Sequence, residues 1–219
     1  MTVPTLSRPR YCNRPDGAIP YTITHTRAEM VSRRLTLSLS AGEAIPTTAN
    51  WLIEDGYLIA SSWDHNNEPI AVGVWGPGDV VIPSAIPIEP LMLSSLSAVE
   101  LQECVITTTD EQAFQEQLCT QLTQLLQASR TRPAELRLLT LLIWLGRRFG
   151  RVNSQGVSLS FSGMNLTHRN LALISGLTRV TVTKALSRFK QDGQLRKLGA
   201  DELISTAQQS PANSDKRRL

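Results

Sequence analysis

The strongest structural signal in the sequence is a pair of short amphipathic segments on either side of one glycine, within residues 166–190. Thr167 and Thr178 each precede one segment, and threonine is a favoured N-cap because its hydroxyl accepts a hydrogen bond from a free amide of the first helical turn. Gly176 lies between the segments and can adopt a positive φ without steric cost. Ala172 is small where a second helix has to cross closely. The sequence therefore predicts two short helices joined by a tight turn.

The second of these segments has two chemically different faces. One face is apolar and is formed by Val182, Ala185, Leu186 and Phe189. The other face is cationic and rich in hydroxyl groups, and it is formed by Arg179, Val180, Thr183, Lys184 and Ser187. Arginine can make two hydrogen bonds to guanine O6 and N7, and hydroxyl groups can bind phosphates. The pattern predicts a helix that packs on a core through its apolar face and enters the major groove of DNA with the other.

A small hairpin is predicted directly after this helix. Asp192-Gly193 turns the chain, and two short stretches, 195–198 and 202–204, flank the turn Gly199-Ala200-Asp201 as the arms of a hairpin. A hairpin in this place is typical of a winged helix-turn-helix, and we expect Lys197 on it to lie near a phosphate.

The preceding part of the chain changes from one period to another. Residues 31–109 alternate in short apolar runs separated by turn signals, which is typical of an antiparallel barrel or roll. Residues 110–131 instead have apolar side chains every three or four positions and predict one long helix. Its stripe resembles a coiled-coil seam, so we expect a dimer interface at Phe114, Leu118, Leu122 and Leu125. The alternative is that this stripe only packs on the roll.

Five segments follow from these patterns. We expect an N-terminal arm (1–30), a β-roll sensor domain (31–109), a dimerisation helix (110–131), a winged helix-turn-helix domain (132–205) and a disordered tail (206–219). The fold class is α+β, with an N-terminal antiparallel β-roll of the cupin-like jelly-roll type. A helix from Pro133 to about Phe149, ended by Gly150, opens the winged domain.

The net charge of +3 hides a strong asymmetry. Residues 35–129 contain twelve Asp or Glu and no Lys or Arg, whereas residues 130–219 contain sixteen Lys or Arg and five Asp or Glu. A basic C-terminal half suits a polyanion such as double-stranded DNA, and an acidic half suggests a module with a different partner.

Composition argues against several other classes. The three cysteines form no CxxC pair, and we expect Cys104 and Cys119 to be small buried side chains. The three histidines are far apart, and His65 lies in a polar turn that we expect to face solvent, so a metal-binding cupin or enzyme is a weak alternative. We expect no catalytic residue, no metal and no cofactor. Because the chain has no long apolar run and no apolar signal region, we expect a cytoplasmic protein with no membrane contact.

The segment LTHRNLALISGLTRVTVTKAL resembles the family of the cyclic-AMP receptor protein and the fumarate–nitrate regulator, and the resemblance covers about residues 31–205. The turns Ala41-Gly42-Glu43 and Pro77-Gly78-Asp79 also match turns of the family's β-roll. The resemblance implies a homodimeric transcription regulator that binds a palindromic operator, with RNA polymerase as a protein partner. It places Arg179 and Lys184 at base-contacting positions. It places four further residues at phosphate-contacting positions: Thr167, His168, Thr178 and Thr181. Arg169, Val180, Thr183 and Lys197 complete the predicted DNA-binding set.

Two departures from the family pattern refine this expectation. Val180 stands where the cyclic-AMP branch has Glu, and because valine cannot accept from cytosine N4, a TGTGA half-site is not expected. The stretch TRVTVT is most similar to the cyanobacterial global nitrogen regulators, which suggests a GTA/TAC palindrome. The roll has no arginine between Arg34 and Arg130 to hold a phosphate, so we expect neither cyclic-nucleotide nor 2-oxoglutarate binding. The alternative function is a β-roll sensor or adaptor whose winged helix mediates protein contacts.

Overall fold

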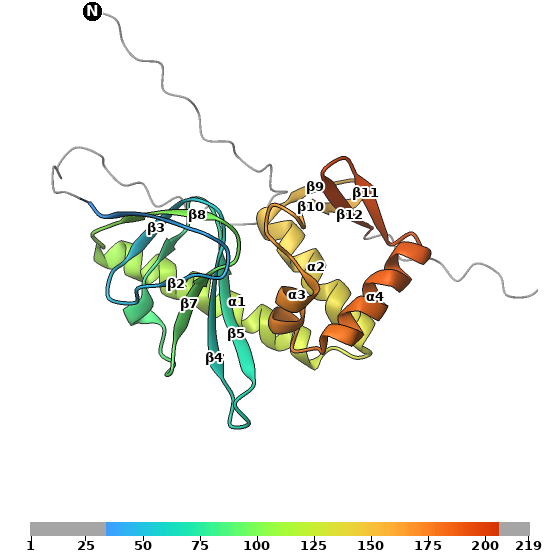
Figure 1. Ribbon diagram of the computed structural model, residues 1–219, viewed down its shortest axis with the longest axis horizontal. Helices are drawn as coiled ribbons and strands as arrows, with labels where there is room; N and C mark the ends of the chain where they lie inside the picture. The colour runs from blue at the N-terminus through green and yellow to red at the C-terminus, as the bar shows by residue number, and fades with distance from the viewer. Residues whose placement is uncertain (1–33, 206–219) are drawn as a thin grey trace, which may run out of the picture.

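The computed structural model describes residues 34–205, which form a β-roll, one long helix, and a C-terminal part of three shorter helices and a small sheet (Figure 1). The predicted arm (1–30) and the predicted tail (206–219) lie outside the described residues. The α+β architecture, with a β-roll, a long helix and a C-terminal winged helix-turn-helix, is the predicted one.

Eight strands and one short 3₁₀ helix, η1 (Pro83–Ala85), build the roll. One sheet has the order β1-β8-β3-β6 and the other β2-β7-β4-β5, and every pairing is antiparallel. The strands are β1 (Thr36–Leu39), β2 (Ala44–Ile45), β3 (Trp51–Asp55), β4 (Leu58–Trp63), β5 (Pro69–Trp75), β6 (Val80–Val81), β7 (Met92–Ser95) and β8 (Val99–Glu103).

Large aromatic side chains fill the space between the two sheets. Trp51 and Trp75 are fully buried, and the Trp75 ring stacks on Phe114 with 5.9 Å between ring centroids. A Cβ atom at Gly73 would come within 2.5 Å of the Trp75 ring, so this strand position accommodates the indole only as glycine. The roll therefore has an apolar interior, which Phe114 and Leu118 of the following helix complete.

Helix α1 (Thr108–Arg130) begins two residues earlier than predicted, because the N-cap is Thr107. Its hydroxyl accepts from the Asp110 amide, and the Asp110 carboxylate accepts from the Thr107 amide, which completes a capping box. Farther along, the buried Gln121 accepts from the Val74 amide at 2.8 Å. The helix is thus fixed along the roll at both its cap and its middle.

Two of the four residues predicted for the dimer interface lie instead on the face of α1 that packs against the roll. Phe114 is 1% exposed and Leu118 is 4% exposed, and both belong to the roll's core, so neither is available to a partner chain. Leu125 is partly buried against the C-terminal core, and only Leu122, at 40% exposure, keeps its predicted accessibility. The structure exposes a different stripe, one position further around the helix, formed by Cys119, Leu122 and Leu126. The expectation that Cys119 is buried is therefore wrong.

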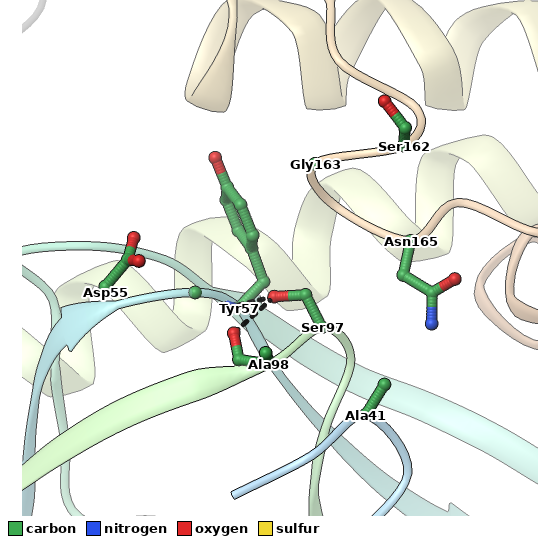
Figure 2. Close-up of a pocket in the computed structure, with 9 residues that line it drawn as sticks. Ala41, Asp55, Tyr57, Ser97, Ala98, Ser162, Gly163 and Asn165 are labelled. Atoms are coloured by element: carbon green, nitrogen blue, oxygen red, sulfur yellow. Dashed lines mark hydrogen bonds between the residues drawn. The ribbon is translucent and has the colours of Figure 1, made fainter. Parts of the chain in front are cut away.

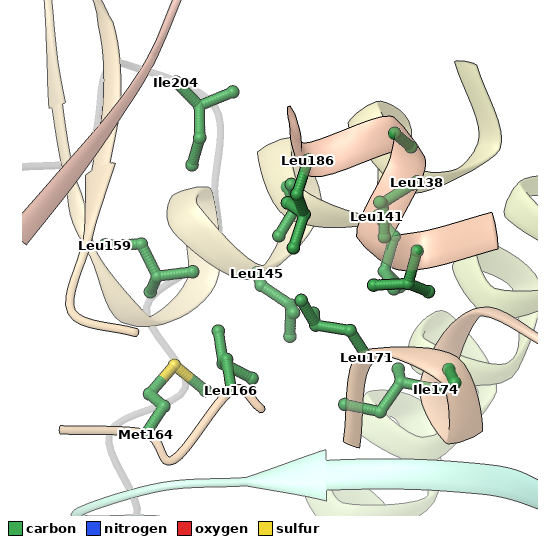
Figure 3. Packing of buried hydrophobic residues seen from close by; sticks show 14 of the residues in the cluster. Leu138, Leu141, Leu145, Leu159, Met164, Leu166, Leu171, Ile174, Leu186 and Ile204 are labelled. Atoms are coloured by element: carbon green, nitrogen blue, oxygen red, sulfur yellow. The ribbon is translucent and has the colours of Figure 1, made fainter. Parts of the chain in front are cut away.

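The C-terminal part packs three helices on a four-stranded sheet of order β11-β12-β10-β9. Its elements are α2 (Ala134–Phe149), β9 (Arg151–Asn153), β10 (Gly156–Leu159), α3 (His168–Ser175), α4 (Arg179–Gln191), β11 (Leu195–Leu198) and β12 (Asp201–Ser205). Figure 3 shows leucines of α2, α3 and α4 meeting Leu159 and Ile204 of the sheet at one centre. Strands β11 and β12 form the predicted wing, and Gly150 ends α2 as expected.

The roll and the C-terminal part share a continuous junction. Ile59, Val74 and Leu96 of the roll belong to the same apolar cluster as the leucines of α2. A polar contact supports the junction, since Arg148 Nη2 of α2 lies 2.8 Å from Asp79 Oδ2 in the β5–β6 turn. No helix within residues 34–205 is long and apolar enough to cross a membrane.

Candidate DNA interface

The turn between α3 and α4 has the geometry that its sequence predicts. Thr167 caps α3, since its hydroxyl accepts from the Asn170 amide at 3.2 Å. The helix ends at Gly176, which has a φ of 63°, and the Leu177 amide donates back to the Ala172 carbonyl at 3.2 Å. Nothing lies within 4 Å of a Cβ built at Gly176, so backbone conformation rather than space favours glycine here.

Helix α4 presents the two faces that its sequence predicts. Thr178 caps it by accepting from the Thr181 amide at 3.2 Å. The underside is buried, and it consists of Val182, Ala185, Leu186 and Phe189. The opposite face is exposed, and it consists of Arg179, Val180, Thr183, Lys184 and Ser187. Val180 is 62% exposed.

The hydroxyl groups at this surface are hydrogen-bonded within the chain, and this limits the number of protons that they can donate to DNA. Thr183 Oγ1 lies 2.8 Å from the Arg179 carbonyl and 2.8 Å from His168 Nδ1. Because a hydroxyl has one proton and the Arg179 carbonyl or the imidazole takes it, none is left to donate to a phosphate. Thr183 therefore connects the start of α3 to the first turn of α4.

Thr178 and Thr181 form a second hydroxyl pair, with 2.8 Å between their Oγ1 atoms. One donates to the other, so one proton of the pair remains for an outside acceptor. Both lie in or next to the first turn of α4, where free amides and the helix dipole also favour an anion.

The remaining predicted residues lie at the ends of neighbouring elements. His168 and Arg169 are exposed in the first turn of α3. Lys197 is exposed on β11, opposite Glu202 of β12. The Glu202 carboxylate in turn accepts from the Phe161 amide at 3.0 Å, which leaves the Lys197 ammonium at the solvent edge of the wing.

Arg179 and Lys184 form no ion pair with any side chain of residues 34–205. Within residues 34–205 the ion pairs join Arg148 to Asp79, and Arg188 to Glu135 and Asp192. Arg188 is at the far end of α4, so the first half of the helix keeps Arg179 and Lys184 without an acidic partner among the described residues. A surface with this charge favours a polyanion.

Arg137 of α2 is a neighbour of this surface that the sequence pattern does not identify. Its guanidinium lies 3.5 Å from the Gly176 carbonyl and 3.4 Å from the Thr131 carbonyl. The first contact spans 39 positions of sequence, so no local pattern could have predicted it.

Potential metal ligands are not clustered in the part of the chain that the structure describes. Between residues 34 and 205 no group of three or more His, Cys, Asp or Glu side chains is placed to hold a metal ion, and His65 is exposed. Burial, with a smaller contribution from Asp110, raises the pKa of the Cys104 thiol to about 11. This thiol is therefore protonated and unreactive at neutral pH.

Comparison with known proteins identifies the group to which this geometry belongs. The Crp-like helix-turn-helix domain matches residues 136–206. Regulatory protein CysR of Synechococcus elongatus is 35% identical over 158 residues, which cover 70% of this chain and 75% of that protein.

Solved structures share the fold at low sequence identity. FixK2 from Bradyrhizobium japonicum has a TM-score of 0.64 at 17% identity, over 80% of this chain and 93% of its own. A CRP/FNR family transcriptional regulator from Thermus thermophilus has a TM-score of 0.57 at 17% identity, over 78% of this chain and 93% of its own. Together with the relative at 35% identity and the matching domain, these likenesses show that the chain belongs to the CRP/FNR family of transcriptional regulators and has its helix-turn-helix DNA-binding domain.

Proposed function

We propose that this regulator binds a palindromic operator as a homodimer, with α4 of each chain in a major groove. The observation that carries the proposal is the outward half of α4, where Arg179 and Lys184 have no acidic partner among residues 34–205 and the underside is fully packed. Because this cationic helix end is already folded and packed, its binding to base edges does not include the free-energy cost of ordering the helix.

Each predicted residue has a distinct role in this proposal. Arg179 and Lys184 contact bases, while Thr167, His168, Arg169 and Lys197 contact phosphates on either side, together with one hydroxyl of the Thr178–Thr181 pair. Thr183 holds His168 and the first turn of α4 in place and makes no phosphate contact of its own. Val180 offers only methyl groups to the groove, which disfavours a cytosine partner and supports a GTA/TAC half-site over TGTGA.

The exposed stripe of α1 is the proposed dimer interface. Cys119, Leu122 and Leu126 are spaced three and four positions apart, which is the spacing of a coiled-coil seam. A two-fold axis along this helix would place two copies of α4 about 34 Å apart, one turn of DNA. RNA polymerase is then the proposed protein partner. The roll is proposed not to sense cyclic nucleotides, because residues 35–129 contain no Lys or Arg to hold a phosphate.

Fluorescence anisotropy with a palindromic GTA/TAC duplex and a scrambled duplex tests the DNA proposal. Arg179→Ala should reduce the preference for the palindrome by about 1–3 kcal/mol, or about 5- to 150-fold. Arg188→Ala is the matched control, because it removes the same charge from the same helix at the end that is paired with Glu135 and Asp192. Equal affinity of the Arg179→Ala variant and the unchanged chain for both duplexes would instead favour the adaptor function. A preference for a TGTGA duplex would contradict the assignment of Val180.

Sedimentation equilibrium tests the dimer. Leu126→Glu places a charge on the exposed stripe and should weaken the dimer by tenfold or more, because the carboxylate would lose its hydration between apolar side chains. Gln127→Glu adds the same charge at a neighbouring exposed position off the stripe and should leave the dimer intact. If both variants sediment like the unchanged chain, the interface lies on another surface.

A further inference from the structure

A cavity of about 650 Å³ that is widely open to solvent lies between the roll and the C-terminal part, close to the start of α3 (Figure 2). Its floor consists of turns of the roll, which contribute Asp55, Tyr57 and Ser97. Its roof is the loop between β10 and α3, which contributes Ser162 and Asn165. In Figure 2 the Tyr57 side chain extends from the floor toward this loop. A volume of this size is typical of small-molecule sites.

Hydrogen bonds and close packing hold the two turns at the floor of the cavity together. The Tyr57 amide donates to Ser97 Oγ at 3.0 Å, and the Tyr57 carbonyl accepts from the Leu96 amide at 2.7 Å. Gly56 has a φ of 82°, and a side chain there would collide with the Ala98 carbonyl, so the two turns are closely locked together. The Tyr57 ring packs edge-on against Phe149 of α2, with 5.4 Å between centroids. A ligand would therefore meet a preformed surface.

The roof is connected to both parts of the molecule through Asn165. Its side-chain Nδ2 donates to the Leu96 carbonyl of the roll at 2.8 Å. Its main-chain carbonyl accepts from Asn170 Nδ2 of α3 at 2.7 Å. Asn165 also has a positive φ of 51°, and it precedes the α3 cap, Thr167, by two positions. An occupant that displaces this loop would move the start of α3.

The lining of the cavity selects against anions. Asp55 is its one charged residue, the other polar side chains are hydroxyl and amide groups, and none is Lys, Arg or His. Asp55 is paired with Glu100 across the β3–β8 ladder, and within residues 34–205 neither forms an ion pair. The one formal charge that a phosphate or carboxylate would meet here is negative, whereas an amine would gain a charge-assisted hydrogen bond.

We propose that this cavity is an effector site for a small amine-bearing molecule without phosphate or carboxylate groups, and that its occupation changes operator affinity through the Asn165 loop. The regulatory half of this inference rests on the proposed DNA-binding function. A ligand can shift the position of α3 only by the difference in its affinity for two arrangements of the loop. Contact with both the floor and the roof provides such a difference.

Calorimetry of the full chain with 1,4-diaminobutane tests the site directly. We expect saturable binding with one molecule per chain, and no binding of succinate, which has the same four-carbon length and opposite charge. Asp55 is exposed, so Asp55→Asn should weaken the amine by about two- to fivefold, the size expected for a solvent-exposed charge pair. Glu54→Gln removes the neighbouring exposed carboxylate outside the lining and should bind like the unchanged chain. Absence of amine binding, or an equal loss in both variants, would overturn the site.

Operator affinity measured with and without the amine tests the regulatory half. The unchanged chain and Glu54→Gln should respond by several-fold, and Asp55→Asn should respond less. Comparison among the variants at one amine concentration removes the direct effect of the amine on DNA. An equal response in all three would overturn the regulatory role while calorimetry decides the site. A chain that binds no duplex even without amine would overturn the proposed function and that role, and calorimetry would again decide the site.

Discussion

Thr183 shows how the hydrogen-bond partners of one side chain decide its function at this surface. The sequence places it on the outward face of its helix, and the structure exposes it there. Its hydroxyl, however, is already hydrogen-bonded to the Arg179 carbonyl and to His168 Nδ1, each at 2.8 Å. The side chain therefore stabilises the arrangement of two other exposed residues, His168 and Arg179.

Replacing Thr183 by valine should weaken binding to every duplex to a similar extent. The variant keeps the shape and removes both hydrogen bonds, so a loss of about 1 kcal/mol, or about fivefold in Kd, is expected from the misplaced His168 ring. Thr183→Ser keeps the hydroxyl and should restore affinity, and anisotropy on operator and scrambled duplexes measures both. A loss confined to one base pair of the operator would show instead that Thr183 contacts that base.

Sequence reasoning succeeded at this surface where the signal was local. The caps at Thr167 and Thr178 and the turn at Gly176 depend on residues within four positions of each other, and all three have the expected geometry. The pairing of Thr183 with His168 spans 15 positions and two helices. Its existence depends on the crossing of α3 and α4, which the pattern of either helix alone does not contain.

Helix α1 is a longer element whose contacts with the rest of the molecule could likewise not be predicted from its own sequence pattern. A period of 3.6 residues predicts an apolar stripe but not the surface that the stripe contacts. Here two stripes lie side by side, one that packs on the roll through Phe114 and Leu118 and one that exposes Leu122 and Leu126. The prediction combined residues of both because each has helical spacing. The buried Gln121 belongs to the first stripe, and its bond to the Val74 amide is invisible to a hydrophobicity pattern.

The contact between α2 and the roll is the polar part of the junction between the two halves. Arg148 and Asp79 are mostly buried, with side-chain exposures of 16% and 22%. The Asp79 carboxylate also accepts from Gln117 Nε2 of α1 at 3.0 Å and from the Gly76 amide at 2.9 Å. One carboxylate thus connects the roll to α1 and α2, while Arg148 also lies 4.9 Å from the Phe149 ring.

Arg148→Ala should lower the free energy of unfolding by about 1–3 kcal/mol, because it leaves a partly buried carboxylate with fewer donors. Urea denaturation followed by tryptophan fluorescence measures this change. Arg147→Ala is the matched control, because Arg147 is the exposed neighbour on the same turn and should change stability by less than about 0.5 kcal/mol. Equal stability of the two variants would mean that the apolar cluster alone holds the junction.

The distribution of charge over the whole molecule fits two functions in one chain. Twelve acidic residues and no basic ones lie between residues 35 and 129, while the basic excess follows in the part that contains α3 and α4. DNA repels the acidic roll and attracts the basic winged helix. The charge pattern therefore orients the chain as it approaches a duplex. Dimerisation along α1 would double this effect by presenting two basic surfaces on the same side.

Cys119 provides a reporter of that dimer, because it belongs to the exposed stripe of α1. In a Cys12→Ser variant, an aromatic disulfide reagent at pH 8 should label Cys119 well before Cys104. The pKa of the Cys104 thiol is about 11, so only about 0.1% of it is ionised at that pH. If the stripe is the seam, the labelling rate of Cys119 should fall as protein concentration rises through the dimer Kd, because the partner helix covers the thiol. Leu126→Glu should abolish this concentration dependence, and Gln127→Glu should preserve it. A chain that sediments as a dimer yet labels at one rate at every concentration would place the two-fold axis away from α1.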